Sequence, residues 1–337
     1  MAGLKGERGE RAVAQRLSEL SAVPAALRGG VVAIGNFDGV HRGHQAVLMD
    51  ALARADQLGA AASVLTFEPH PRTVFRPERP VFRLTPAPMK AKLLGLIGFD
   101  AVFEYAFTPE FAAHSAETFV ADILVRRLGV CHVVTGFDFH FGKGREGGPA
   151  FLMAAGKRLG FGVSLVDAFR DERAEVISSS RIRDLLAKGD VAEAAALLGY
   201  RQSIVSEIIH GKKLGRTLGY PTANMALPPE TGLKPGIYAV RLRRADGTLH
   251  DGVASFGRRP TVDTEGAPLL LETFVFDASL DLYGETCTVS LFGYLRPELK
   301  FDGLDALVVQ MRQDEAEARA LLSGVTPKSP LDAAIAF

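Results

Sequence analysis

The sequence predicts an α/β protein of two domains, a parallel β-sheet covered by helices and then a small antiparallel β-barrel or sandwich with a terminal helix. From residue 31 to about residue 198, short apolar runs alternate with segments of helical periodicity, the pattern of a parallel sheet covered on both faces. After residue 199 the segments are short, β-rich and separated by turn residues, as in a barrel. The 337 residues are enough for two hydrophobic cores. We expect an N-terminal extension at 1–29, a first domain at 30–198 and a second at 199–337.

Five apolar runs are predicted as the strands of the first domain. They are VVAIG (31–35), SVLTF (63–67), AVFEYAF (101–107), VCHVVTG (130–136) and VSLVDAF (163–169). Between them, HQAVLMDALARADQLG and ETFVADILVRRLG place apolar residues at helical spacing. Because ligands bind such sheets at the carboxyl ends of the strands, we expect the functional residues at those ends.

The second domain carries shorter β signals and one long helical signal. Its predicted strands lie in GIYAVRLRR, HDGVASFG, LLLETFVF and TCTVSLFGYL. The dipeptide Asp246-Gly247 is a hairpin signal. A helix is predicted at 304–323, with an apolar face that comprises Leu304, Leu307, Val308 and Met311.

Composition narrows the functional classes. Positive and negative charges balance at 39 each, which argues against a protein devoted to nucleic acid. The two cysteines, Cys131 and Cys287, lie far apart and predict neither a disulfide framework nor a zinc site. No apolar run is long enough to cross a bilayer, and the opening MAGLKGERGERAVAQ does not resemble a secretory signal. We expect a cytoplasmic protein whose partners are small molecules, not nucleic acid or membrane, and leave self-association open.

The first strand leads directly into GNFDGVHRGH (35–44), and a helix follows. Glycines let the backbone turn tightly and approach a ligand. A helix that starts after a strand offers free N–H groups and the positive end of its dipole to an anion. His41 and His44 can both face that position, which suits a triphosphate. The spacing by itself also fits a metal-binding pair or two surface histidines.

Four motifs together resemble a known enzyme family. H-x-G-H after a first strand resembles the signature of the nucleotidyltransferase superfamily, and the full string 35–44 resembles its flavin-specific branch. TFEPHP (66–71), GFDFHFG (136–142) and ISSSRIR (177–183) extend the resemblance in the same order. The set is similar to that of bacterial bifunctional riboflavin kinase/FMN adenylyltransferases, which implies a Rossmann-like first domain.

The resemblance implies roles in adenylyl transfer from ATP to FMN. His41 and His44 would contact the ATP phosphates. Because the FMN phosphate itself attacks the α-phosphorus, no protein nucleophile is required, and catalysis depends on positioning and charge. The other implied residues are Gly35, Asn36, Phe37, Asp38 and Gly43 for ATP, Ser179, Ser180, Arg181 and Arg183 for pyrophosphate, and Pro69, His70 and Asp138 for FMN.

Some positions depart from the family pattern. Asp138 and His140 stand where many relatives carry Asn and Arg nearby, and Ser180 stands where Thr is frequent. All three keep polar groups, so they affect detailed roles more than the activity. TFEPHP taken alone predicts only a strand and a proline turn.

The second motif, GKKLGRTLGYPTANM (211–225), is dense in glycine, basic and hydroxyl residues. It is not a Walker loop, because no G-x-x-x-x-G-K-[ST] occurs. A glycine-rich arch can wrap a nucleotide through backbone amides, although residues 211–219 taken alone fit an ordinary mobile loop better. Thr222 and Asn224 alternate on one extended face, and their oxygens suit Mg²⁺ shared with ATP.

This motif resembles the riboflavin-kinase signature, and the likeness continues through residues 236–240, 252–262, 271–277, 281–284 and 295–311. It implies an antiparallel β-barrel kinase domain in which Glu272 acts as base toward the riboflavin 5′-hydroxyl. An isolated strand glutamate would instead face solvent. Phe274 stands where many relatives carry His. The implied ATP-binding residues are Gly211, Lys212, Gly215, Arg216, Thr217, Gly219 and Pro221, the implied metal ligands are Thr222 and Asn224, and the implied flavin contacts are Arg296 and Glu298.

The leading hypothesis is therefore a flavin-cofactor enzyme that uses ATP and Mg²⁺ to convert riboflavin to FMN and FMN to FAD. The alternatives are a riboflavin kinase with a degenerate transferase domain, a nucleotidyltransferase for another substrate and a flavin-binding regulator without catalysis. Intact H-x-G-H and ISSSRIR argue against the first. The kinase-like second domain argues against the second, and the retained phosphate- and base-type residues argue against the third.

Overall fold

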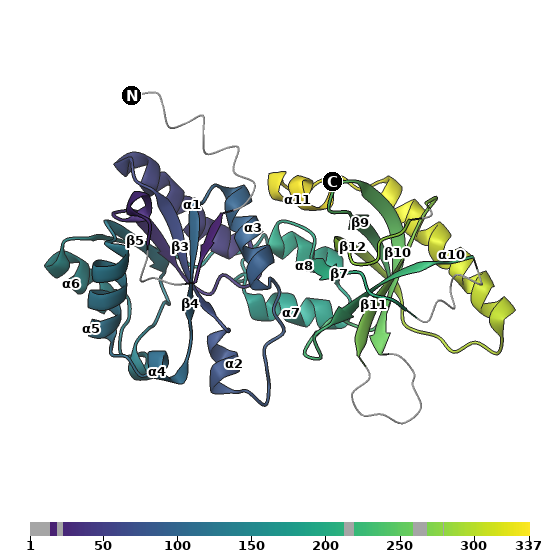
Figure 1. The fold of residues 1–337 in the computed structure, drawn as a ribbon, viewed down its shortest axis with the longest axis horizontal. Helices are drawn as coiled ribbons and strands as arrows, with labels where there is room; N and C mark the ends of the chain where they lie inside the picture. The colour runs from purple at the N-terminus through teal and green to yellow at the C-terminus, as the bar shows by residue number, and fades with distance from the viewer. Residues whose placement is uncertain (1–13, 19–22, 212–218, 259–267, 279) are drawn as a thin grey trace. The chain divides into compact units, whose positions relative to one another are not determined.

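The computed structural model describes residues 14–18, 23–211, 219–258, 268–278 and 280–337. They form two compact units that divide between Ser179 and Ser180, and Figure 1 draws both as ribbons. The boundary predicted between the two functional domains, near residue 199, remains a prediction. Within the described ranges, none of the helices is long and apolar enough to cross a membrane.

The first unit is built on a parallel sheet with the strand order β1-β4-β3-β2-β5-β6. Its strands are β1 Gln15–Leu17, β2 Val31–Ile34, β3 Ala62–Glu68, β4 Ala101–Ala106, β5 His132–Gly136 and β6 Gly162–Val166. The parallel sheet and its five predicted strands are confirmed. The sequence does not predict β1, because this short edge strand exposes Gln15 and Arg16 and carries no apolar alternation.

Helices lie on both sides of this sheet (Figure 1). They are α1 Arg42–Leu58, α2 Pro71–Phe75, α3 Ala87–Ile97, α4 Pro109–Ala112, α5 Ala116–Thr118 and α6 Pro149–Leu159, with the short 3₁₀ turns η3 Ala25–Leu27 and η5 Lys143–Arg145. The segment predicted as a helix at 117–129 is helical, but most of it is the π-helix η4, Phe119–Leu128. Its buried residues still recur three or four apart, so its apolar pattern matches that of an α-helix.

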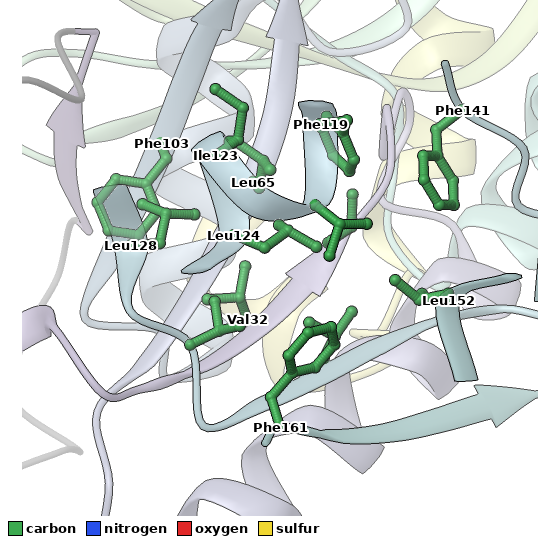
Figure 2. Packing of buried hydrophobic residues seen from close by; sticks show 14 of the residues in the cluster. Val32, Leu65, Phe103, Phe119, Ile123, Leu124, Leu128, Phe141, Leu152 and Phe161 are labelled. Carbon is green, nitrogen blue, oxygen red and sulfur yellow. The ribbon is translucent and has the colours of Figure 1, made fainter. Parts of the chain in front are cut away.

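The main core of the first unit lies between the sheet and the η4 helix. Val32 of β2 points into this cluster with Leu65 of β3, Phe103 of β4 and Leu124 of η4 (Figure 2). Because side chains alternate along a strand, the neighbouring β2 residues face the opposite side, where α1 packs on β2 and β5. The sheet is therefore buried on both faces, and its strands are apolar runs without alternation.

The second unit contains an antiparallel sheet with the strand order β7-β12-β9-β10-β11-β8. Its strands are β7 Ser203–Glu207, β8 Thr222–Leu227, β9 Gly236–Arg243, β10 Leu249–Arg258, β11 Leu269–Val275 and β12 Thr286–Arg296. An additional bridge, in which Ile209 N donates to Asn224 O at 2.8 Å, joins the two edges. The sheet thereby nearly closes, and the predicted antiparallel β-barrel is confirmed.

Helices cover part of this barrel. They are α7 Ser179–Lys188, α8 Val191–Leu198, α10 Leu304–Ser323 and α11 Pro330–Ala336. The predicted bounds of the 304–323 helix are confirmed, and Leu307, Val308 and Met311 of its predicted apolar face are partly buried. Leu304 is 55% exposed, and the buried residues Asp314, Ala318 and Leu322 lie farther along the helix. Tertiary contacts, not local apolarity, decide which turns of α10 are covered.

Truncating a core side chain should destabilise the first unit. Leu124 is fully buried, so Leu124→Ala is expected to lower the free energy of unfolding by about 2–5 kcal/mol, because the lost contacts leave a cavity. Met153 on α6 is 54% exposed, and Met153→Ala should change stability by less than about 0.5 kcal/mol. Urea denaturation followed by circular dichroism checks both variants, and equal losses would contradict the assignment of the core.

Candidate functional site

The loop between β2 and α1 contains the predicted ATP-binding residues and is conformationally strained. Phe37, Gly39 and Val40 have φ values of 46°, 90° and 37°. Glycine adopts this left-handed region readily, but for the β-branched Val40 it is a clear outlier. Such backbone persists only where surrounding contacts hold it. Gly35 allows a close approach, because a Cβ there would lie 3.0 Å from the Phe37 ring.

The two histidines meet at the start of α1, as the sequence predicts. His41 is the N-cap residue, and its Nδ1 accepts a hydrogen bond from His44 N at 3.2 Å. The two rings stack with centroids 3.6 Å apart. A Cβ on Gly43 would lie 3.2 Å from the His41 ring, so glycine gives that ring its space. The N-terminus of α1 thus combines two imidazoles with the positive end of a helix dipole, an arrangement that attracts phosphate.

The carboxyl ends of β3, β2 and β5 lie side by side, because these strands are neighbours in the sheet. TFEPHP begins in the last residues of β3, and Thr66 Oγ1 donates to Asn36 O at 3.2 Å, which joins this motif to the first loop. His70 is buried as the N-cap of α2, directly after Pro69. GFDFHFG follows β5 and leaves Asp138 exposed. The structure therefore brings three of the four predicted motifs to one edge of the first unit.

The fourth motif, ISSSRIR, begins beside the same loop. Ser179 Oγ donates to Asp38 O at 2.8 Å. Ser180, Arg181 and Arg183 follow on α7 but belong to the second unit, where Arg181 lies 3.9 Å from Glu193. Their participation in the phosphate site remains a prediction.

The sequence motifs alone do not identify a buried ionic network beside this loop. Asp38 is 1% exposed and accepts hydrogen bonds from Leu84 N and Thr85 N at 3.3 and 3.0 Å. Arg83 binds both oxygens of Glu68 at 2.7 Å, and its Nε lies 3.6 Å from Asp38. Lys90 on α3, also 1% exposed, donates to Glu68 at 2.9 Å. In the sequence, this network is indicated only by a lysine within an apolar helical segment, because the partners of Lys90 come from other segments of the chain.

The predicted kinase residues come together on two neighbouring strands. In the β8–β11 pair, Asn224 lies directly opposite Glu272 and Thr222 lies opposite Phe274. Residues opposite each other in an antiparallel pair project from the same face, so the three predicted residues share one face. Phe274, at the departure from the family pattern, has its ring centroid 4.7 Å from that of Tyr220.

Asn224 offers an oxygen to a ligand. It is 3% exposed, and its Nδ2 donates to Thr222 O at 3.0 Å. Its Oδ1 is buried and has no hydrogen-bond partner among the described residues. A Cβ on Gly211 would lie 2.6 Å from Nδ2, so the start of the predicted glycine arch packs directly on this side chain. A cavity of about 40 Å³, lined in part by Pro221, Thr222 and Ala223, lies on β8.

The remaining predicted contacts divide into three groups. Lys212, Gly215, Arg216 and Thr217 lie outside the described residues, while Gly219 is exposed. Arg296 pairs with both oxygens of Asp314 on α10 at 2.6 and 2.7 Å, so this side chain already has a structural partner. Glu298 is exposed overall on the chain after β12, but its carboxyl lies against Gly257, and this local loss of solvent raises the pKa of the carboxyl. The flavin contacts predicted for both residues remain predictions.

Comparison with known families matches this two-part arrangement. The model of the FAD synthetase family matches residues 23–181, and that of the riboflavin kinase family matches residues 198–322. The first region contains the His41–His44 site and the second contains the Asn224–Glu272 site. Fold, sites and family models together define a chain with one FAD synthetase region and one flavokinase region.

Relatives that carry both regions are similar over nearly their whole length. The Haemophilus influenzae protein named bifunctional riboflavin kinase/FMN adenylyltransferase is 40% identical to this chain, and the match covers 88% of this chain and 96% of the relative. The Listeria monocytogenes protein of that name is 39% identical over 87% of this chain and 92% of its own. The Escherichia coli protein of that name is 38% identical over 89% of this chain and 95% of its own length. The chain belongs to the bifunctional riboflavin kinase/FMN adenylyltransferase family.

A solved structure shares the fold across both units. A Streptococcus pneumoniae protein described as a macrolide-efflux protein superposes with a TM-score of 0.80 and 30% identity. The match covers 91% of this chain and 99% of that one. Its description concerns that protein, and family membership here comes from the family models and the curated relatives.

The ionic network predicts a stability change in acid. Burial by itself raises the pKa of Glu68, but hydrogen bonds and charges from Arg83 and Lys90 outweigh it and hold that pKa at about 2, below the ordinary 4.5. A carboxyl with a lowered folded pKa contributes stability that is present above its unfolded pKa and lost as the pH falls through its folded one. The first unit should therefore lose stability from pH 4.5 toward pH 2, and Glu68→Gln should flatten that slope.

Urea midpoints measured across this pH range check the expectation. Glu117→Gln is the matched control, because Glu117 forms an ion pair with Arg158 in which both side chains are about half exposed, and it should leave the slope unchanged. Equal slopes for wild type and Glu68→Gln would contradict the assigned role of Glu68.

Proposed function

We propose that this protein makes FAD from riboflavin in two ATP-dependent reactions, each in its own region. Riboflavin and ATP give FMN and ADP at the Asn224–Glu272 site, and FMN and ATP give FAD and pyrophosphate at the His41–His44 site. The observation that carries this proposal is the presence of both matched regions in one chain, each with its chemically suited residues side by side in the fold.

Adenylyl transfer requires the FMN phosphate to attack the α-phosphorus of ATP as pyrophosphate leaves. His41, His44 and the α1 N-terminus stabilise the charge on the phosphates, with Gly35, Asn36, Phe37, Asp38 and Gly43 forming the ATP loop. Ser179, Ser180, Arg181 and Arg183 bind the departing pyrophosphate. Pro69, His70 and Asp138 contact FMN. No side chain becomes covalently modified in this scheme.

Riboflavin phosphorylation requires a base for the 5′-hydroxyl, and Glu272 accepts that proton. The Asn224 carboxamide oxygen and the Thr222 hydroxyl are hard donors of the kind that Mg²⁺ binds, and the buried, unpartnered Asn224 Oδ1 fits such an ion. Bound Mg²⁺ would offset negative charge on the phosphates. The residues of the glycine arch from Gly211 to Pro221 hold the nucleotide, and Arg296 and Glu298 lie toward the flavin. A cytoplasmic location and small-molecule partners complete the proposal.

Two single substitutions should separate the reactions. Glu272→Gln keeps the shape of the side chain but removes the base, so FMN formation should fall about 10²–10⁴-fold while FAD formation from supplied FMN persists. His44→Ala should lower FAD formation about 10²-fold or more and spare FMN formation. Chromatography of products from riboflavin, or from FMN, with ATP and Mg²⁺ measures both rates. Loss of both activities from either change, with the fold intact, would refute the two-site assignment.

The metal assignment predicts a selective Mg²⁺ dependence. Asn224→Leu removes the unpartnered oxygen and should raise the Mg²⁺ concentration that half-saturates FMN formation by about tenfold or more. Asn224→Asp keeps an oxygen at the same place and should retain tighter Mg²⁺ use. Titrating Mg²⁺ in the kinase assay distinguishes them, and an unchanged half-saturating concentration in Asn224→Leu would exclude Asn224 as a ligand.

A further inference from the structure

A buried network joins the strained loop to the strand and helix beside it. We call Asp38, Thr66, Glu68, Arg83, Thr85 and Lys90 the Lys90 network. It comes from four segments, namely the loop after β2, the end of β3, residues 83–85 and α3. It holds the loop at two places. Thr66 Oγ1 donates to Asn36 O at 3.2 Å, and Thr85 Oγ1 accepts from Gly39 N at 2.8 Å.

The hydrogen bond from Lys90 to Thr66 sets the direction of the bond from Thr66 to Asn36. A threonine hydroxyl has one proton to donate and two lone pairs. Lys90 Nζ, which is only a donor, donates to Thr66 Oγ1 at 3.0 Å. The single hydroxyl proton of Thr66 is then directed to Asn36 O, and the ammonium charge strengthens the second bond through the first.

Lys90 has a carboxylate partner inside the protein. Burial lowers the pKa of Lys90, and the neighbouring Glu68 carboxylate opposes that effect. Glu68 lies 2.9 Å from Nζ and is held by Arg83 on its other side. A buried cation without a charged partner would strongly destabilise the fold. The Lys90 ammonium therefore depends on Glu68 remaining beside it.

Asn36 is the residue of the loop whose backbone oxygen Thr66 binds. Its Oδ1 is buried and has no hydrogen-bond partner among the described residues. An amide oxygen accepts only from N–H or O–H groups, which phosphates at neutral pH lack and which the adenine amino group and the ribose hydroxyls carry. Because buried polar atoms are almost always hydrogen-bonded, an unsatisfied acceptor of this kind indicates a position where a ligand donates a hydrogen bond.

We propose that Lys90 and Thr66 are positioning residues for ATP in adenylyl transfer, and that they act by fixing Asn36 so that its side-chain oxygen accepts a hydrogen bond from the nucleoside part of ATP. This inference rests on the proposed FMN adenylyltransferase activity. It assigns the network a role in substrate binding, in addition to its contribution to stability. Because the contact is made equally in ground state and transition state, its loss should raise KM more than it lowers kcat.

The chain provides a matched pair of substitutions for the test. Thr66→Val removes the hydroxyl and keeps the shape, and Thr66→Ser keeps the hydroxyl. Thr135 on β5 makes the same kind of bond to Ile34 O, also at 3.2 Å and also buried, but Ile34 is already held on both sides by strand pairing. Thr135→Val is therefore the control for removing a buried threonine hydroxyl at this end of the sheet.

Steady-state kinetics of FAD formation from FMN, with ATP varied, gives the result. Thr66→Val is expected to raise KM for ATP about threefold to tenfold with kcat within about twofold. Thr66→Ser should restore the wild-type KM, and Thr135→Val should not change it. Lys90→Met should raise KM in the same direction and further. Riboflavin phosphorylation by the same preparations should be unchanged in every variant, which shows that the second unit is intact, and a cooperative urea transition of each variant shows that the first unit is folded.

The outcomes separate this inference from the proposed function. A wild-type protein that makes no FAD from FMN would overturn the proposed function and the inference with it. A wild-type protein that makes FAD, together with Thr66→Val of unchanged KM for ATP, would overturn the inference alone. The same holds if Thr66→Ser is as impaired as Thr66→Val, because the hydroxyl is then not the group that matters. If Lys90→Met does not fold, the Thr66 pair still decides the question.

Discussion

Parallel pairing of β2 with β3 and β5 is the constraint on which the first site depends. The three strands run in the same direction, so their carboxyl ends, and the motifs that follow them, meet at one edge of the sheet. Residues more than 100 positions apart in the chain thereby become neighbours, as when Thr135 bonds to Ile34. The loop after β2 lies in the middle of this edge and receives contacts from both sides.

The same loop shows how a strained backbone is maintained. Left-handed backbone at Phe37 and Val40 is unfavourable by about 1–3 kcal/mol for each such residue, so the surrounding contacts must offset it. They include the buried carboxylate of Asp38, the hydroxyls of Thr66 and Thr85, and the Ser179 hydroxyl. A carboxylate predicted to shape the ATP pocket thus accepts backbone N–H groups of residues 84 and 85. These bonds assign Asp38 a structural role in the loop, and its role in ATP binding stays a prediction.

The second site depends on a different constraint, the register in which the antiparallel strands β8 and β11 pair. Asn224 and Glu272 share a face because they are paired directly across β8 and β11, and a shift of one residue in either strand would place them on opposite faces. The bridge from Ile209 to Asn224 fixes one side of β8 and pairing with β11 fixes the other. The candidate metal ligand therefore lies where the barrel closes, which gives its oxygen a rigid position.

The sequence by itself determined the fold class, β2 to β6 of the first sheet, β9 to β12 of the second and the motif residues near the strand ends, because apolar periodicity, glycine placement and short chemical strings are local properties. The bounds of α10 and the neighbourhood of His41 and His44 follow from such local signals. Only the tertiary structure decided which turns of α10 are buried, that β1 joins the sheet edge, and that Lys90, Glu68 and Arg83 form one network with Asp38. These outcomes depend on residues distant in the chain, since a buried charge is stable only beside partners that the fold supplies. The opening prediction of an α/β unit followed by a barrel thus held, and folding added the contacts that hold its first loop.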